Sequence, residues 1–313
     1  QIRSSAASDV YKRQLCSWRV SCNAVAASEG HLSEVSGIGA RRREMLMEIG
    51  IRGLEDLAAA EPDRLAAQME RFGDQHRVVA RTLVAQARVQ RDGRVERLLR
   101  SPAVPELETA PGVLLYDIES DPDARHDFLH GFVCLPRDSS GAWLPHAAKY
   151  HPVLMLQDHP EERSWRRLTC LLDRFASWPV LHYGETESLA LRRMAQRQGV
   201  ADADLTDLRQ RLVDVHARVR SHWLLPLNSY GLKSVAAWRG FRWGQAGADG
   251  ARALLWWRQW QGEGERRRGN SHALDRIFRY NRDDCLATWA VAEWLLQRDG
   301  APDQEEPAVT GGS

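Results

Sequence analysis

A short apolar run, GVLLYDIESD, has acidic residues embedded in it. Such a run is consistent with a β-strand that is buried on both faces. Because side chains alternate along a strand, Asp117 and Glu119 point to the same face. Buried carboxylates destabilise a fold unless a cation compensates their charge. The sequence therefore predicts that this strand carries part of a metal site.

Two further acidic residues are candidates for the same site. Glu187 follows the strand-like PVLHYG, and Asp284 lies one helical turn after Tyr280 in FRYNRDDCLATWAV. Residues four apart share one stripe of a helix, which favours Asp284 over its neighbour Asp283. A site built only from oxygen ligands suits Mg²⁺ or Mn²⁺, and the usual work of these ions is phosphoryl transfer.

Each of these residues also has a purely structural interpretation. Asp117 and Glu119 can serve as ordinary salt-bridge partners. Glu187 can favour a helix N-terminus through the helix dipole, and Tyr280 can pack in the core. The occurrence of all of them in this order argues for a metal site more strongly than any single residue does.

Composition sets outer bounds on the protein. A chain of 313 residues with 43% hydrophobic content can bury one full domain and a smaller unit. The formal net charge of +1 indicates no overall basic field. Five cysteines argue for a reducing compartment, and so for a cytoplasmic protein, rather than for a disulfide framework. No run approaches the ~18 apolar residues of a membrane span, so no membrane partner is predicted.

Residues 110–298 are predicted to form an α/β domain. FLHGFVCLP and KYHPVLMLQ continue the strand pattern, and the GAW turn between them predicts antiparallel neighbours. A helical segment, PEERSWRRLTCLLDRFASW, leads to the fourth strand, PVLHYG. Helices are then predicted over 187–198, 205–220, 229–239, 249–260 and 272–297. This order predicts a ribonuclease-H-like mixed sheet with flanking helices.

A small all-α unit is predicted before this domain, over residues 31–100. A Gly37-Ile38-Gly39 turn opens a helix that runs through Ile49, and an arginine-rich helix over 71–100 connects to SPAVPELETAPG, a proline-rich boundary. The turn resembles a helix-hairpin-helix element, in which backbone N–H groups approach a phosphate.

That resemblance implies contact with the backbone of a nucleic acid. Arg41 and Arg42 follow the turn directly and would add positive charge to the contact. The alternative is a pair of packing helices that use glycine simply to turn. In the α/β domain, Lys233 heads a helix in SYGLKSVA and is a candidate contact to a scissile phosphate; the alternative is an exposed helix residue.

The α/β domain resembles the DEDD superfamily of 3′–5′ exonucleases, the DnaQ-like branch of the ribonuclease-H-like fold. The first motif of that superfamily is D-x-E on the first strand, which Asp117 and Glu119 match. The second is commonly H-N-x-x-F-D; this chain has HYGETE, with Tyr183 in place of the asparagine and Glu187 in the acidic position. Glutamate there departs from the wider superfamily.

The third motif is either H-x4-D or Y-x3-D. Arg279 stands where the histidine would be, whereas Tyr280 and Asp284 satisfy the tyrosine form, so the resemblance is to the DEDDy branch. It implies two ions, Mg²⁺ or Mn²⁺, held by the four carboxylates, with Glu187 acting through water. Tyr280 would orient the attacking water, and the substrate would be a single-stranded 3′ end or a duplex.

The order of parts resembles RecB-like nucleases that carry a C-terminal ribonuclease-H-like exonuclease domain. In that arrangement residues 15–30 are the remnant of an upstream nuclease domain, with Cys16 and Cys22 left from a cysteine-rich end. The alternative is that the two cysteines are ordinary thiols in a disordered leader. Two cysteines cannot hold an iron–sulfur cluster, which needs four ligands, so none is expected. Residues 1–14 are interpreted as a non-native leader, which implies N-terminal truncation, and 299–313 as a disordered tail.

Two other classes of function remain open from the sequence. The DEDD site can be inactive in a nucleic-acid-binding module that serves an upstream nuclease. The chain can also be a scaffold within a larger repair nuclease.

Overall fold

The computed structural model describes residues 19–156, 159–201, 203, 205–262 and 272–300. Contacts between Cα atoms divide the chain into two compact units, and each is described by itself. Of the described residues, unit 1 contains 19–100 and 220–235, and unit 2 contains 101–219 and 236–300. The predicted leader, Cys16 and nearly all of the predicted tail lie outside the described residues.

Unit 1 is mainly helical. Its elements are α2 (Arg19–Ser28), the 3-10 helix η1 (Leu32–Glu34), α3 (Ala40–Glu48), α4 (Leu54–Ala59), α5 (Pro62–Glu70), α6 (Asp74–Asp92), β1 (Glu96–Arg97) and β7 (Trp223–Leu224). Leu32, Leu46, Leu57 and Met69 share its core. The connecting helix is shorter than predicted, because Gly93 ends α6 in a left-handed conformation (φ 65°) and β1 then pairs with β7.

Unit 2 is built on a mixed sheet with the strand order β4-β3-β2-β5-β6. The strands are β2 (Gly112–Asp121), β3 (His126–Pro136), β4 (Lys149–Leu154), β5 (Val180–His182) and β6 (Leu212–Asp214). β2 lies in the centre, antiparallel to β3 and parallel to β5. The predicted antiparallel pairing of the second and third strands is confirmed for β3 and β4.

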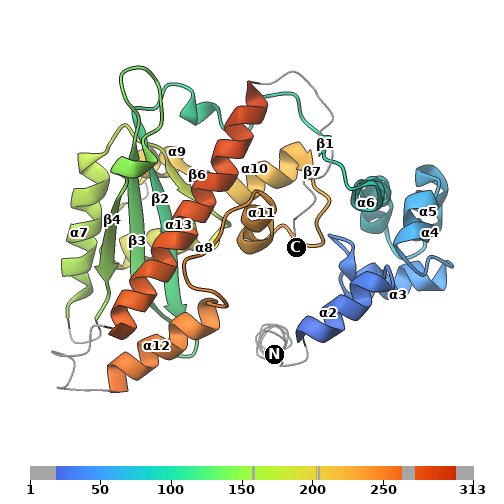
Figure 1. The fold of residues 1–313 in the computed structure, drawn as a ribbon, viewed down its shortest axis with the longest axis horizontal. Helices are drawn as coiled ribbons and strands as arrows, with labels where there is room; N and C mark the ends of the chain where they lie inside the picture. Colours follow the sequence, from blue (N-terminus) through green and yellow to red (C-terminus); the bar gives the residue numbers. More distant parts are fainter. Residues whose placement is uncertain (1–18, 157–158, 202, 204, 263–271, 301–313) are drawn as a thin grey trace. The chain divides into compact units, whose positions relative to one another are not determined.

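Helices cover both faces of this sheet. They are α7 (Glu161–Arg174), α8 (Thr186–Arg197), α12 (Gly250–Gly262) and α13 (His272–Asp299). Unit 2 also contains α9 (Thr206–Arg211) and the 3-10 turns η2 (Pro105–Leu107) and η3 (Pro145–Ala147), whereas α10 (Val215–His222) and α11 (Leu232–Trp238) each contain residues of both units. The long helix α13 crosses one face over β2 and β3 (Figure 1). Helices α7 and α8 pack on the other face.

Each face has its own apolar cluster. Tyr116 and Phe132 pack with Leu168 of α7 and Leu191 of α8. On the α12 and α13 side, Phe128 stacks on Trp257 with ring centroids 4.4 Å apart. Because β2 is covered on both faces, most of its side chains are buried, while Asp117, Ile118 and Ser120 are partly buried. That is the environment into which the sequence places Asp117 and Glu119.

The predicted helix over 205–220 was wrong, because a strand interrupts it. Residues 212–214 form β6, which pairs in parallel with β5 and places Val213 beside Leu181 and Asp214 beside His182. Three residues between arginine-rich helical segments have no local strand signal. Burial of Val213 at the sheet edge overrides the local helix propensity.

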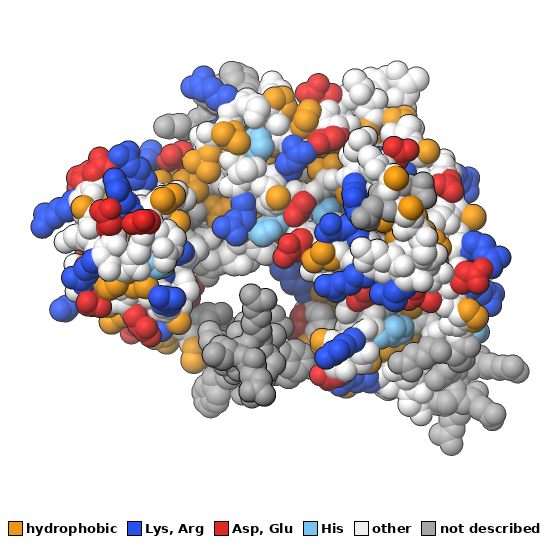
Figure 2. All heavy atoms as spheres, turned by 180° about the vertical axis from the view of Figure 1, so that it is seen from behind, with side chains coloured by type: hydrophobic (Ala, Val, Ile, Leu, Met, Phe, Trp, Pro, Cys, Tyr) orange, Lys and Arg blue, Asp and Glu red, His pale blue; other side chains and the backbone are white. Residues whose placement is uncertain are grey.

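The predicted fold class is confirmed: a helical N-terminal unit precedes a mixed five-stranded sheet with flanking helices, consistent with a ribonuclease-H-like fold. On the face seen in Figure 2, basic and acidic side chains are interspersed, which agrees with the net charge of +1. None of the described helices combines the length and apolar character that crossing a membrane requires.

Candidate metal centre

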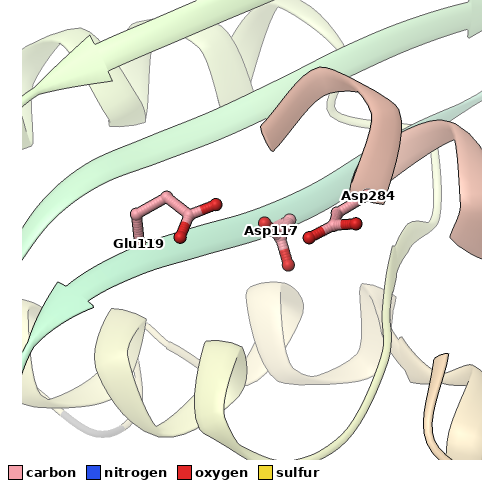
Figure 3. Close-up of side chains that lie close together, drawn as sticks. All are labelled: Asp117, Glu119 and Asp284. Atoms are coloured by element: carbon pink, nitrogen blue, oxygen red, sulfur yellow. The ribbon is translucent and has the colours of Figure 1, made fainter. Parts of the chain in front are cut away.

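Three carboxylates meet where α13 crosses β2. One oxygen from each of Asp117, Glu119 and Asp284 lies within 4.8 Å of the others. Figure 3 shows Asp117 and Glu119 on the strand and Asp284 on the helix, with their carboxylates turned toward one another. The predicted convergence of the strand pair with the last helix is therefore present.

The negative charges of these three clustered carboxylates favour the binding of a positive ion. Burial, and then the charges of Asp284 and Glu119, raise the pKa of Asp117 well above its usual value. Hard oxygen ligands at this spacing fit a divalent cation such as Mg²⁺ or Mn²⁺. Asp117, Glu119 and Asp284 are thus the residues that can hold a metal.

Asp284, rather than Asp283, belongs to the cluster. The Asp283 carboxylate accepts a hydrogen bond of 2.9 Å from the backbone N–H of Gly244 and pairs with Arg282 at 3.1 Å. Asp284 instead accepts a hydrogen bond of 2.6 Å from the indole Nε1 of Trp243. Asp283 therefore anchors a loop, whereas Asp284 faces the other two carboxylates of the cluster.

An amide on α13 orients Asp117. Asn281 Nδ2 donates to Asp117 Oδ2 at 2.7 Å, and Asn281 Oδ1 accepts from the Tyr150 hydroxyl at 2.8 Å. The chain runs closely past this amide at Gly131 of β3, where an added Cβ would overlap the Asn281 side chain. Gly131 thus permits the approach of α13 that brings Asp284 to the sheet.

Glu187 lies in the first turn of α8 and is only 7% exposed. Its Oε2 has no hydrogen-bond partner within the described part of the chain. Burial, followed by the charges of Asp214, Asp127 and Asp284, raises its pKa to about 7. Glu187 is outside the group of three carboxylates, but it lies within electrostatic reach of Asp117 and Asp284. Its assignment as a ligand stays a prediction.

The turn that carries Glu187 is held by a residue that the sequence interpretation missed. Asp214, at the end of β6, accepts hydrogen bonds from the backbone N–H of Gly184 at 2.9 Å and of Ala217 at 3.1 Å. Its charge also contributes to the raised pKa of Glu187. Asp214 was missed because its strand was predicted to be helix.

Tyr280 is buried on the cluster side of α13. Burial, the charges of Asp284, Glu119 and Asp117, and a hydrogen bond to Asp284 raise its pKa well above the usual value for tyrosine. The phenol therefore stays protonated and can donate a hydrogen bond, whereas it cannot act as a base.

A pH experiment tests the environment of Glu187. A carboxyl group whose folded pKa is about 7 and whose ordinary value is 4.5 holds a proton in the folded state that the unfolded state has lost. Stability therefore rises as pH falls from about 7 toward 4.5. In EDTA, we expect Glu187→Gln to be more stable than the wild type by ~2–3 kcal/mol at pH 8, and this difference should shrink by pH 5. Thermal unfolding at several pH values measures it.

The matched control is Glu185→Gln, which alters an exposed carboxylate two residues earlier. This variant should follow the wild type at every pH. A difference between Glu187→Gln and the wild type that is constant over pH would contradict the assignment of a buried, repelled carboxylate.

The predicted nucleic-acid contacts lie in unit 1, whereas the three clustered carboxylates lie in unit 2. Gly37 has φ 88°, a left-handed conformation that favours glycine, whereas Gly39 has φ −84° and precedes α3. Arg42 donates a hydrogen bond from Nη1 to the carbonyl oxygen of Gly37 and so braces the turn, while Arg41 is exposed. Lys233 belongs to the same unit, so its predicted role at the scissile phosphate stays untested.

Of the residues that position the carboxylates of the metal centre, some could be predicted from the sequence and others could not. Gly131 interrupts an apolar strand, which indicates a close backbone approach. Asn281 and Trp243 offered no comparable signal, because asparagine within a helix and tryptophan in a loop each have many ordinary uses. Their contacts with Asp117 and Asp284 depend on how α13 and the loop before α12 pack.

Comparison with known proteins agrees with this architecture. A family described as a domain of unknown function, DUF4332, matches residues 19–91. A search of curated proteins and a search of solved structures gave no match. The RNase_H superfamily matches residues 114–296, which include all three carboxylates of the cluster. Because this match covers more than half of the chain, the chain belongs to the RNase_H superfamily.

Proposed function

We propose that this chain is a metal-dependent nuclease that hydrolyses phosphodiester bonds of DNA or RNA, specifically a 3′–5′ exonuclease of the DEDDy type. The observation that carries the proposal is the convergence of Asp117 and Glu119 of β2 with Asp284 of α13. Mg²⁺ or Mn²⁺ bound there would stabilise the negative charge that develops on the phosphoryl group. Membership of the RNase_H superfamily supports nucleic acid as the substrate class.

The surrounding residues support specific tasks in this reaction. Asn281 holds Asp117 through Nδ2, and Trp243 holds Asp284 through Nε1, so both carboxylates are oriented before a metal binds. Glu187 would act as the fourth carboxylate through an intervening water. Tyr280, which stays protonated, would orient the attacking water by a hydrogen bond.

We further propose that the helical unit and the α/β domain correspond to the C-terminal part of a RecB-like nuclease. The order of a small helical unit before a ribonuclease-H-like domain supports this resemblance. Under this proposal unit 1 contacts the backbone of the nucleic acid.

The decisive assay follows hydrolysis of a 5′-labelled single strand with Mg²⁺, with Mn²⁺ and with EDTA. A 3′–5′ exonuclease gives a ladder that shortens from the 3′ end, releases 5′-mononucleotides and leaves a circular strand intact. Cleavage of the circular strand would indicate an endonuclease instead of an exonuclease. Binding of the linear strand without any cleavage in Mn²⁺ would instead support an inactive nucleic-acid-binding module.

The contact proposed for unit 1 predicts a change in salt dependence. Arg41 is exposed beside the turn, so Arg41→Ala should weaken binding of all sequences alike and reduce the slope of log K against log salt by ~0.7–0.9. Fluorescence anisotropy at several salt concentrations measures this slope. Arg64→Ala, which removes an exposed arginine on α5, is the control. Equal slopes for the two variants would rule out a phosphate contact by Arg41.

A further inference from the structure

A groove runs between the edge strand β4 and helix α7 of unit 2. Its volume is about 930 Å³, and β4 and α7 supply all of its lining residues. The groove does not belong to the metal centre: α7 packs on the face of the sheet opposite to α13, with Val153, Leu168 and Leu172 in one cluster. No carboxylate occurs among the residues that line it within the described part of the chain.

Arginines form one wall of the groove. They share one face of α7 at helical spacing and are all exposed: Arg163, Arg166, Arg167 and Arg174. Arg166 pairs with Glu162 at 2.8 Å, and both side chains are well exposed. Within the described residues, Arg163, Arg167 and Arg174 form no ion pair, although Arg174 lies over the ring of Phe175. Three guanidinium groups thus remain available for an anion.

The opposite wall adds to the positive field. Lys149 is exposed at the start of β4, and His151 lines the groove two residues later. The pKa of His151 is lowered by burial and then by the charges of Arg174 and Lys149. The charges of the two walls therefore act on the same space.

The geometry suits an extended ligand better than a single small anion. Along an α-helix, the eleven steps from Arg163 to Arg174 span about 16 Å. One strand of a nucleic acid carries a phosphate about every 3.4 Å along a duplex axis, so the wall can face roughly three to five phosphates. Guanidinium groups match phosphate oxygens in pairs and are less strongly hydrated than ammonium groups.

We propose that this groove binds the sugar–phosphate backbone of a nucleic acid strand, at a site separate from the acidic cluster. The proposal takes its class of ligand from the proposed function and adds a second contact that the reaction itself does not require. Such a contact positions a strand without reading its sequence. It should therefore increase affinity for long strands and leave the chemical step unchanged.

The test compares strand binding by matched charge variants. In Arg163→Gln/Arg167→Gln/Arg174→Gln the three unpaired guanidinium groups are lost, while Arg163→Lys/Arg167→Lys/Arg174→Lys keeps the charge. Binding of a fluorescent 30-nucleotide single-stranded DNA is measured in EDTA at several salt concentrations. We expect the glutamine variant to bind at least tenfold more weakly, with the slope of log K against log salt smaller by about 2. The lysine variant should keep most of the slope.

Controls separate this proposal from the proposed nuclease function. Arg252→Gln, an exposed arginine of α12, should bind like the wild type. Hydrolysis of a trinucleotide with Mn²⁺ tests the metal centre alone and should be the same for the glutamine variant and the wild type. Absence of hydrolysis in every protein, with weaker binding only in the glutamine variant, would refute the nuclease and retain the groove.

Two results would overturn the groove proposal. One is equal affinity and equal salt slope for the glutamine variant and the wild type, when thermal unfolding shows that both proteins are folded. The positive charge would then serve to keep the edge strand from pairing with other chains. The other is that polyglutamate competes as well as a DNA strand of equal charge, which would assign the groove to acidic proteins.

Discussion

Replacing Asp117 by asparagine is expected to abolish metal-dependent hydrolysis, with a loss of about 10³-fold or more in rate. The reason is that Asp117 lies between Glu119 and Asp284 (Figure 3) and supplies one of the three carboxylates of the cluster. Loss of a ligand that stabilises transition-state charge removes several kcal/mol, and ~1.4 kcal/mol corresponds to a tenfold change in rate. The rate of mononucleotide release at saturating Mn²⁺ measures the effect.

The same substitution should stabilise the metal-free protein. The pKa of Asp117 is raised by burial and by its acidic neighbours, so the ionised carboxylate is unfavourable in the fold at neutral pH. Asparagine keeps the shape and removes that repulsion, and each kcal/mol gained raises the melting temperature by about 2–4 °C for a domain of this size. Thermal unfolding in EDTA at pH 7.5 therefore gives a second measurement, independent of activity.

Asp173→Asn, which changes an exposed carboxylate of α7, should leave both measurements as in the wild type. A variant of Asp117 that loses activity and is also less stable in EDTA would indicate a structural carboxylate instead of a metal ligand. Full activity of Asp117→Asn would remove the metal centre from the reaction altogether.

Replacing Gly131 by alanine is expected to disturb the centre without touching a carboxylate. The new Cβ would overlap the Asn281 side chain, which is fully buried and held by Tyr150 and Asp117. Overpacking of this kind costs about 1–3 kcal/mol. Displacement of α13 also moves Asp284 away from Asp117, and a misplacement of about 1 Å can lower a rate by about 10²-fold.

Unfolding followed by tryptophan fluorescence measures the stability of unit 2, because most of the described tryptophans lie there. Gly250→Ala is the matched control, since a Cβ at Gly250 meets no described atom within 4 Å. Adding Asn281→Ala to Gly131→Ala should recover part of the lost stability, because it removes the side chain that the Cβ meets. An unchanged melting temperature for Gly131→Ala would mean that α13 does not approach β3 as closely as described.

The sequence predicted the sheet well where its strands are long and apolar. The β2 sequence GVLLYDIESD contains the apolar run Val113 to Tyr116 followed by Ile118, and such a run needs no tertiary information to be interpreted as a buried strand. β6 is three residues long and was predicted as helix, because its strand conformation comes only from pairing with β5. The end of that strand holds Asp214, so the error about the fold also hid a residue of the site.

Local sequence patterns were enough to predict how residues within a single strand or helix lie relative to one another. The alternation of a strand places Asp117 and Glu119 on one face, and the helical repeat places Tyr280 and Asp284 on one stripe. Both relations follow from backbone geometry that every strand and helix shares. They were sufficient to identify three carboxylates that the fold brings together.

Which faces of the strand and the helix meet depends on packing between elements that are distant in the sequence. Asn281 and Asp117 are 164 residues apart, and their hydrogen bond exists because α13 crosses the sheet on the face that carries the carboxylates. The crossing is set by the lack of a side chain at Gly131 and by apolar packing around Ile277 and Trp257. Such contacts depend on the shapes of surfaces that are far apart in the chain, and local sequence patterns contain no information about them.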